Sequence, residues 1–450
     1  MPRISAVVTT GIYCRPGCPA RPHPEHVRGY DTAAAAEAAG FRACHRCRPY
    51  RLDQPVGVTG PQLVGRAVRL VLDGALDRGT EADLGTRLGI SPRHLRRLFV
   101  EHVGVTPDQL ARSRRAHFAR RLLDDTDLSI TQVAYAAGFG SVRQLNRACA
   151  DIFRAPPREL RDRRRLADRL VADGGLALRL GFSGELAWDA MLGFLAARAA
   201  LGVERVDERG YRRTIEVDGD PGVLELQPGG PDHVVLRAHL PHWEGLIHVV
   251  HRARAILNLD LDVVACEAHL DADPVIGPLV AARTGLRVPG TWDPWEVAVR
   301  AIVGQQVSVA GATTLLGRIV ARHGRPVPGL AALGLTHLFP SAEVLAKADL
   351  DGLGLTGARI AAIHAVAAAV ERGDVRLDGG EGLDGLTRSL ERLPGIGPWT
   401  AQYVAMRMSE PDAFPATDLV LRRALPDVAT RAEAWRPWRA TAAMHVWANA

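Results

Sequence analysis

Residues 390–408 read LERLPGIGPWTAQYVAMRM, in which one glycine lies on each side of an isoleucine and a proline follows the second glycine. Gly395 and Gly397 allow a sharp turn, and Pro398 suits the first turn of a helix. A helix that begins at such a turn presents free backbone N–H groups, which bind anions. The segment therefore predicts a hairpin turn followed by a helix whose N-terminus binds a phosphate, with Gly395, Gly397 and Thr400 as the contact residues.

An acidic residue, Asp418, follows in AFPATDLVLRRAL (413–425), directly before a predicted helix. Aspartate at such a position is normally an N-cap, and the residues alone also allow a catalytic carboxylate. Trp399 and Tyr403 lie four residues apart on one face of the helix after the hairpin, and Trp447 follows near the end of the chain. Aromatic side chains at these positions are typical of a packed core, so a base-binding role and a structural role both stay open.

Two close pairs of cysteines lie within residues 14–47, as CRPGC and CHRC. Their spacing is near that of a zinc ribbon, and four thiolates suit tetrahedral Zn²⁺. No apolar run approaches the roughly 20 residues that cross a bilayer, so we expect a cytoplasmic, nucleoid-associated protein without membrane contact. Disulfides are rare in that compartment, which favours metal binding. The predicted zinc ligands are Cys14, Cys18, Cys44 and Cys47.

Length and charge indicate several domains and an anionic partner. A chain of 450 residues with 47% apolar and 24% charged residues is typical of a soluble globular protein of roughly three or four domains. Residues 1–170 hold 29 Arg against 17 Asp and Glu, so this segment is basic and the remainder is net acidic. We expect double-stranded DNA to bind the basic segment.

Two related passages, residues 81–107 and 129–157, each contain a short apolar helix pattern, a glycine break and a serine that can cap the next helix. The capping residues are Ser91 and Ser141. This pattern predicts two helix-turn-helix units whose second helices enter the major groove. Arg suits guanine, and Asn or Gln suits adenine. The candidate contacts are Arg93, His94, Arg96, Arg97, Ser141, Arg143, Gln144, Asn146 and Arg147.

The centre of the chain alternates apolar and polar residues over 211–219 and 222–240, which predicts strands broken at PGGPD. From about residue 290, Ala, Leu and Val recur at helical spacing, and we expect this segment to be all-helical. The two isolated cysteines, Cys149 and Cys266, are expected in the core. The fold class is multidomain and mainly α: a small zinc domain, an all-α double helix-turn-helix domain, an α+β domain and an all-α helix-hairpin-helix domain.

The N-terminal motifs VVTTGIYCRPGCPARP (7–22) and EAAGFRACHRCRP (37–49) resemble the methyl-accepting domain of the Ada family, which takes methyl groups from DNA phosphotriesters. The resemblance implies that Cys14 is both a zinc ligand and the methyl acceptor. Zinc keeps this thiol as the nucleophilic thiolate. The tandem helix-turn-helix units resemble the AraC-type domain that follows in Ada, which implies promoter DNA and RNA polymerase as partners. Only eight residues precede Thr9, so we expect this domain to be short at its N-terminus.

LPGIGPWTA followed by Asp418 resembles the helix-hairpin-helix DNA glycosylases, the AlkA family in particular, and the likeness extends to residues 191–204, 285–319 and 435–447. The resemblance implies excision of alkylated bases of the 3-methyladenine type after base flipping. Asp418 is then the catalytic carboxylate that stabilises an oxocarbenium-like sugar or orients water. It further implies that Trp399, Tyr403 and Trp447 contact the base and that the carbonyls of Leu393 and Gly395 bind a monovalent cation. Gln306 stands at the position where the family has an apolar residue that wedges into the duplex.

Alternative chemistries need residues that this chain lacks. A lyase of the same superfamily needs a lysine near the hairpin, and the single lysine, Lys347, lies well before it. An iron–sulfur cluster needs four cysteines, and none follows Cys266. A monofunctional hydrolase remains. The non-enzymatic alternative is a transcriptional regulator with an inactive glycosylase domain, and the intact LPGIG with Asp418 argues against it.

We therefore predict a monomeric fusion protein that repairs alkylated DNA and regulates the response to it, with methylation at Cys14 promoting promoter binding. The expected domains are an Ada-like zinc domain at 1–52, an AraC-type domain at 58–165, an AlkA-like N-terminal α/β domain at 174–286 and a helix-hairpin-helix glycosylase domain at 287–450.

Overall fold

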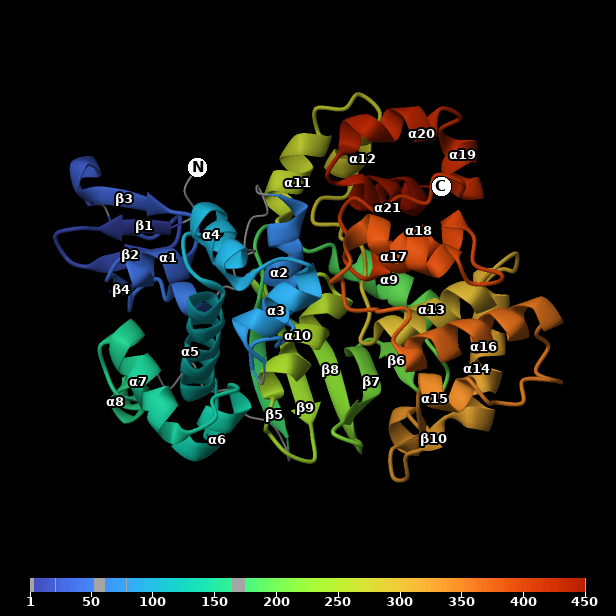
Figure 1. Cartoon of the computed structure of the whole chain (residues 1–450), viewed down its shortest axis with the longest axis horizontal. Helices are drawn as coiled ribbons and strands as arrows, with labels where there is room; N and C mark the ends of the chain where they lie inside the picture. Colours follow the sequence, from blue (N-terminus) through green and yellow to red (C-terminus); the bar gives the residue numbers. More distant parts are fainter. Residues whose placement is uncertain (1–3, 21, 52–60, 78, 164–174, 450) are drawn as a thin grey trace. The chain divides into compact units, whose positions relative to one another are not determined.

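The computed structural model describes residues 4–20, 22–51, 61–77, 79–163 and 175–449 (Figure 1). The chain forms two compact units, one of Met1–Phe182 with His242–His251 and the other of Ser183–Pro241 with Arg252–Ala450. The expected domain boundaries at residues 52, 58, 165 and 174 lie outside the described residues. Within the described ranges, no helix combines the length and the apolar character that a bilayer crossing requires.

The first unit begins with a small sheet of strand order β3-β1-β2-β4, in which β1 is antiparallel to β2 and β3 while β2 and β4 are parallel. The parallel pair ends at Cys14 and immediately before Cys44, so both cysteines lie at the same edge of the sheet. The elements are β1 (Ile4–Val7), β2 (Ile12–Cys14), a 3₁₀ turn (Pro24–His26), β3 (Val27–Tyr30), α1 (Ala33–Ala38), β4 (Arg42–Ala43) and a 3₁₀ turn (Pro49–Arg51).

Both predicted helix-turn-helix units are present. Ser91 caps α4 by accepting a hydrogen bond from the His94 amide at 3.2 Å, and Ser141 caps α7 through the Gln144 amide at 3.2 Å. Gly89 supplies the left-handed residue, φ +72°, that ends the helix before α4. The remaining elements of this unit are α2 (Gln62–Leu72), α3 (Glu81–Leu88), α4 (Pro92–His102), α5 (Pro107–Asp125), α6 (Ile130–Ala136), α7 (Val142–Phe153), α8 (Pro157–Asp162) and β5 (Leu176–Gly181).

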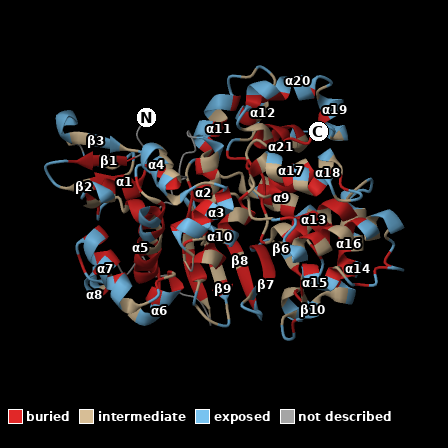
Figure 2. Ribbon diagram, viewed as in Figure 1, coloured by how far each residue is buried: buried red, intermediate tan, exposed pale blue. Residues whose placement is uncertain are grey.

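Helix α5 is the central element of this unit and is buried along most of its length (Figure 2). Its buried residues include charged ones, which are tolerated in an interior when they are paired. The Arg120 guanidinium lies 2.7 Å from the fully buried Asp124 carboxylate. The Tyr50 hydroxyl, from the turn after the cysteine-rich segment, donates to the same carboxylate at 3.1 Å. The Tyr50 bond joins the cysteine-rich segment to α5 of the helix-turn-helix domain.

In the second unit, the predicted strands are β7, β8 and β9, and together with β6, which the sequence analysis did not predict, they form an antiparallel arrangement of order β9-β8-β7-β6. Their bounds are β6 (Glu204–Asp207), β7 (Gly210–Val217), β8 (Asp220–Gly230) and β9 (His233–His239), with α9 (Trp188–Arg198) before them. The register of β8 against β9 shifts between Pro228 and Gly230, within the predicted PGGPD break. The alternating pattern was therefore a reliable indicator of β7, β8 and β9.

The rest of this unit is helical except for one short pair of strands, β10 (Arg325–Pro326) and β11 (His337–Leu338), so the expectation of an all-helical segment is wrong at this point. Strands of two residues have no detectable periodicity in a sequence. Cys149 and Cys266 are fully buried, as expected. Helix α10 (Leu246–Ile256) belongs to this unit only from Arg252 onward. The other helices are α11 (Val263–Leu270), α12 (Ile276–Ala282), α13 (Pro294–Val303), α14 (Val309–His323), α15 (Ala342–Leu345), α16 (Gly357–Arg372), α17 (Gly382–Glu391), α18 (Pro398–Arg407), α19 (Leu419–Ala424), α20 (Val428–Arg431) and α21 (Arg439–Asn449).

Buried ion pairs connect the sheet of this unit to α13. Arg213 of β7 donates to the Glu296 carboxylate at 3.1 Å, and Arg300 of α13 donates to Glu204 of β6 at 2.7 Å. Burial alone would raise the pKa of Glu204, but the charges of Arg300 and Arg213 outweigh it and lower the pKa to about 2. The Glu204 carboxylate therefore stays charged near neutral pH, whereas burial raises the pKa of Glu296.

We predict that Arg213→Met destabilises the second unit by about 3–5 kcal/mol, because it leaves the Glu296 carboxylate buried without its main partner. Urea unfolding followed by tryptophan fluorescence measures this loss. Arg209→Met, at an exposed position between β6 and β7, is the matched control and should change stability by less than about 0.5 kcal/mol. Equal effects of the two substitutions would contradict the prediction.

Candidate active site, metal centre and DNA-binding surface

Asp418 lies at the start of α19, half-buried, and accepts four hydrogen bonds. Its Oδ1 accepts from the amides of Val420 at 2.9 Å and Leu421 at 3.0 Å, so the N-cap role is confirmed. The same oxygen accepts from Trp447 Nε1 at 3.0 Å, and Oδ2 accepts from Trp399 Nε1 at 2.8 Å. The carboxylate is thus fixed in orientation but not sealed from solvent.

The three aromatic residues singled out in the sequence lie together: Trp399 and Trp447 donate to this carboxylate, and Tyr403 lies next to both of their rings. Trp399 and Tyr403 stack with ring centroids 5.1 Å apart and an interplanar angle of 8°. Trp447 is tilted by 51° against Tyr403 at 6.3 Å. Because the Trp399 and Tyr403 rings contact each other directly, a further planar ring has to stack on an outer face of this pair rather than between its members.

Two arginines that sequence reasoning missed surround Tyr403. Arg407 Nη1 donates to the Tyr403 hydroxyl at 2.9 Å and Nη2 donates to the Gly290 carbonyl at 2.8 Å. Arg198 lies over the Phe194 ring at 3.8 Å, and burial lowers its pKa. Burial of Tyr403 acts to raise its pKa, but the charges of Arg407 and Arg198 outweigh it, and the pKa is lowered. Arg407, four residues after Tyr403 on α18, could have been found from helical spacing; Arg198 of α9 could not.

The hairpin before α18 has the predicted turn. Gly395 has φ +76°, and a Cβ there would lie 2.9 Å from the Ala362 Cβ, so only glycine fits without strain. Gly397 has an ordinary φ of −98° and open space around it, which leaves room for an approaching phosphate. Gln305 was missed: its Nε2 donates to the Gly395 carbonyl at 2.9 Å and to Thr400 Oγ1 at 3.0 Å.

Gln306 is exposed in the loop between α13 and α14, where its φ is +53°. Left-handed backbone is uncommon for a residue with a side chain and is found in turns and functional loops. The exposed Val307 and Val309 follow it, at 36% and 42% exposure. The tip of this loop therefore combines a polar residue with two apolar ones.

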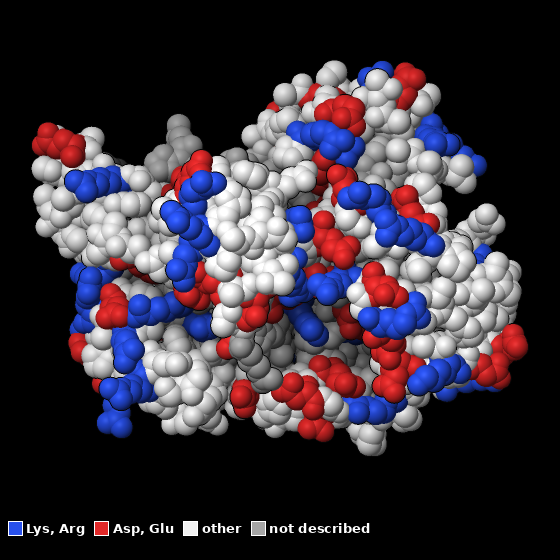
Figure 3. Space-filling view, viewed as in Figure 1, with Lys and Arg blue, Asp and Glu red and all other residues white. Residues whose placement is uncertain are grey.

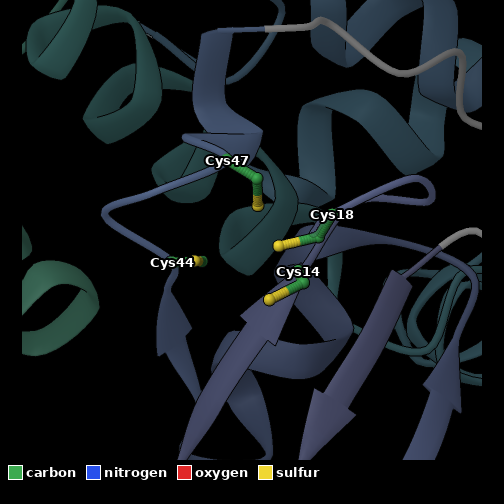
Figure 4. A group of neighbouring side chains, drawn as sticks. All are labelled: Cys14, Cys18, Cys44 and Cys47. Carbon is green, nitrogen blue, oxygen red and sulfur yellow. The ribbon is translucent and has the colours of Figure 1, made fainter. Parts of the chain in front are cut away.

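The four predicted metal ligands converge at the edge of the small sheet (Figure 4). Their Sγ atoms all lie within 4.8 Å of one another, a spacing that fits tetrahedral Zn²⁺ with bonds of about 2.3 Å. The hydrogen bond between Cys14 and Cys47 lowers the pKa of Cys47 to about 5 and raises that of Cys14. Thiols this close cannot all ionise unless a cation compensates them, so the donor set fits a metal.

The second helices of the two helix-turn-helix units are α4 and α7, and arginine side chains gather over α4 and around α7 and α8 (Figure 3). Some of the candidate contacts have local partners: Arg96 pairs with Glu81, and Asn146 Nδ2 donates to the Val142 carbonyl at 2.9 Å. Gln144 accepts from the Gly140 amide at 2.9 Å, which ties it to the turn. The exposed candidates are Arg93, Arg96, Arg97, Arg143, Gln144, Asn146 and Arg147.

Known families match three consecutive parts of the chain. The metal binding domain of Ada matches residues 4–50, a helix-turn-helix domain matches 84–163 and the AlkA N-terminal domain matches 177–293. The class defined by this order, together with the hairpin and Asp418, is a DNA-binding regulator joined to a DNA glycosylase fold.

Relatives identify the family. A probable bifunctional transcriptional activator/DNA repair enzyme AlkA of Mycobacterium tuberculosis is 41% identical over 458 residues, which cover 99% of this chain and 92% of the relative. DNA-3-methyladenine glycosylase 2 of Escherichia coli is 34% identical over 269 residues, 58% of this chain and 93% of that protein. This chain belongs to the family of bifunctional transcriptional activator/DNA repair proteins of the AlkA type.

A solved structure supports the fold of the second unit. The 3-methyladenine DNA glycosylase from Archaeoglobus fulgidus superposes with a TM-score of 0.53 at 22% identity, covering 60% of this chain and 96% of that one. At this identity the likeness concerns the fold alone.

We predict that the purified protein contains about one zinc ion per chain and that Cys44→Ser releases it, because a structural site needs all four ligands. Elemental analysis measures the metal content. Cys149→Ala is the control: burial raises the pKa of Cys149 to about 12, so this thiol stays protonated and the variant should keep its zinc. Full zinc content in Cys44→Ser would refute the assignment of the ligands.

Proposed function

We propose that this protein excises alkylated bases of the 3-methyladenine type from DNA, with Asp418 as the catalytic carboxylate. One observation supports this most directly: the Asp418 carboxylate is partly exposed and is oriented by the indole N–H groups of Trp399 and Trp447, whose rings lie next to Tyr403. The name of the Escherichia coli relative, DNA-3-methyladenine glycosylase 2, agrees with this chemistry.

In the proposed reaction, the target nucleotide leaves the duplex because its glycosidic bond is inaccessible within the stack. The electron-poor ring stacks on the outer face of the Trp399 and Tyr403 pair or on Trp447. As the C1′–N bond breaks, its electron pair goes to the base and neutralises the methylated ring. Asp418 stabilises the positive charge that develops on the sugar, and water adds its hydroxyl at C1′ and releases a proton.

The hairpin and the neighbouring loop are proposed to hold the DNA during this reaction. Gly395, Gly397 and Thr400 bind a phosphate at the start of α18, and Gln306 occupies the gap left by the flipped nucleotide. A monovalent cation is proposed on the carbonyls of Leu393 and Gly395. Each carbonyl already accepts one hydrogen bond, at 3.3 Å from the Ile396 amide and at 2.9 Å from Gln305, and a second lone pair remains for the cation.

The first unit is proposed to act as a methyl-dependent regulator. Zinc bound by four thiolates has two negative charges in excess, and methyl transfer from a phosphotriester to Cys14 leaves one. Less negative charge then faces the DNA backbone, so promoter affinity rises. Cys14 is 7% exposed, and the acceptor role proposed for it follows from the resemblance to the Ada family. RNA polymerase contact, nucleoid association and a monomeric state belong to the same proposal.

The alternative is a transcriptional regulator whose glycosylase domain is inactive. The two functions differ in whether Asp418 is needed only as a helix cap or also for chemistry. Asparagine is as good an N-cap as aspartate, so replacing Asp418 by Asn separates the two roles.

We predict that Asp418→Asn lowers the rate of 3-methyladenine release from methylated DNA by at least about 100-fold, because the variant lacks the charge that stabilises the transition state. Base release from radiolabelled methylated DNA measures the rate. Asp427→Asn, at the exposed start of α20, is the matched control and should keep the wild-type rate. Wild-type activity in Asp418→Asn rejects the catalytic assignment, and no activity in the wild-type protein favours the regulator.

We predict that incubation with DNA containing methyl phosphotriesters adds one methyl group per chain, located on Cys14 by peptide mass spectrometry. Affinity for promoter DNA at fixed salt should then rise roughly fivefold, because one unit charge at about 4 Å in water is worth about 1 kcal/mol. A methyl group on Cys18, Cys44 or Cys47 would reassign the acceptor, and unchanged affinity would reject the charge mechanism.

A further inference from the structure

Two arginines beside the aromatic residues of the candidate active site, Arg198 and Arg407, have no acidic partner in the described part of the chain. Neither guanidinium lies within 4.0 Å of a described carboxylate. Arg407 donates instead to the Tyr403 hydroxyl at 2.9 Å and to the Gly290 carbonyl at 2.8 Å. Arg198 Nη1 donates to the Phe194 carbonyl at 3.4 Å. Both positive charges are therefore held by neutral groups rather than by an anion.

The two guanidiniums lie near one another. The Cζ atoms of Arg198 and Arg407 lie 3.8 Å and 5.0 Å from the centre of the same Phe194 ring. Arg407 is buried, at 6% exposure, and Arg198 is half-buried. Burial lowers the pKa of Arg198, Tyr403 opposes this shift, and the positive charge of Arg407 adds to it. Because arginine has a pKa far above neutral, both residues stay charged.

A negative charge lies on the other member of the aromatic pair. Trp399 donates to the Asp418 carboxylate at 2.8 Å, and its ring stacks on Tyr403, which accepts from Arg407. The stacked pair is thus bonded to a carboxylate at one ring and to a guanidinium at the other. Charges that are partly buried interact more strongly than charges in water. Any group that stacks on this pair therefore lies in the field of both charges.

This field has a definite effect on a glycosidic bond. When the C1′–N bond breaks, its electron pair passes to the base, so a cationic methylated base becomes neutral. The sugar becomes cationic until water adds to C1′ and releases a proton. Guanidiniums near the base repel it before cleavage and no longer repel it afterwards. A repulsion that is present in the bound ground state and absent in the transition state lowers the barrier.

We propose that Arg198 and Arg407 promote base release electrostatically, by repelling the bound cationic base until the electrons of the breaking bond neutralise it. Asp418 supplies the opposite charge for the sugar. This inference rests on the proposed function, because it requires a base stacked beside Tyr403. Neither arginine needs to touch the substrate, since Arg407 acts across the Tyr403 ring and Arg198 across a distance.

Replacing Arg198 by Gln tests the proposal, because this residue is half-buried and its bond to the Phe194 carbonyl is long, so the variant should fold. Single-turnover base release from a duplex with one cationic methylpurine gives the maximal rate and the apparent Kd. Dividing this Kd by that for the same duplex with an abasic site removes the general effect of charge on DNA binding. We expect the rate and this relative Kd both to fall about tenfold, the effect of unit charges roughly 10 Å apart at an effective dielectric constant of about 20.

Two further variants separate charge from packing. Arg198→Lys keeps the charge and should retain the wild-type rate and relative Kd. Arg209→Gln removes the same charge at an exposed turn, where water and salt screen it, and should also behave like the wild type. Thermal unfolding verifies that each variant is folded.

The outcomes distinguish this inference from the proposed function. A rate that falls while the relative Kd rises indicates a packing defect and overturns the role of Arg198. An unchanged rate and Kd in Arg198→Gln overturns it as well, and base excision stands if Asp418→Asn is inactive in the same assay. Absence of base release by the wild-type protein rejects the proposed function itself.

Discussion

The Asp418 carboxylate joins three helices of the candidate active site, and the geometry of that site depends on this junction. Its oxygens accept from Trp399 on α18, from Trp447 on α21 and from two amides at the start of α19. All three helices are therefore positioned by hydrogen bonds to the same two carboxylate oxygens. The carboxylate is thus preorganised before any substrate binds, which is the condition under which a fixed charge is most effective for a transition state.

A second junction connects this site to the DNA-facing loops. The Gln305 amide bridges the loop after α13 to the hairpin before α18, through Gly395 and Thr400. The adjacent Gln306 is exposed at the tip of the same loop. The Gln305 side chain therefore fixes the distance between two DNA-binding features. One is Gln306, which is proposed to fill the gap in the duplex, and the other is the hairpin turn, which is proposed to hold a phosphate. A flipped nucleotide therefore has to fit this distance and also reach the aromatic pocket.

The features that could be predicted from the sequence depend on short-range rules. Ser91 and Ser141 were identified as caps because a cap acts within three residues, and Asp418 because it directly precedes its helix. The cysteine cluster was identified from two tight pairs, which a metal brings together. Gln305, Arg198 and the β10–β11 pair were missed. Each of these depends on a contact between residues distant in the chain, and no spacing rule reveals such a contact.

The choice of arginine over lysine has a chemical consequence at the active site. Arginine stays charged when buried and has several donors in fixed positions, so it suits the pairs Arg213–Glu296, Arg300–Glu204 and Arg120–Asp124. Arg407 likewise donates to Tyr403 beside the candidate pocket. A guanidinium is a poor nucleophile because it is not deprotonated near neutral pH. The single lysine, Lys347, is exposed just after α15, outside the helices that position Asp418. With no lysine amine there to attack C1′, water is the nucleophile that remains, and an ionised carboxylate beside the sugar is the group suited to orient it.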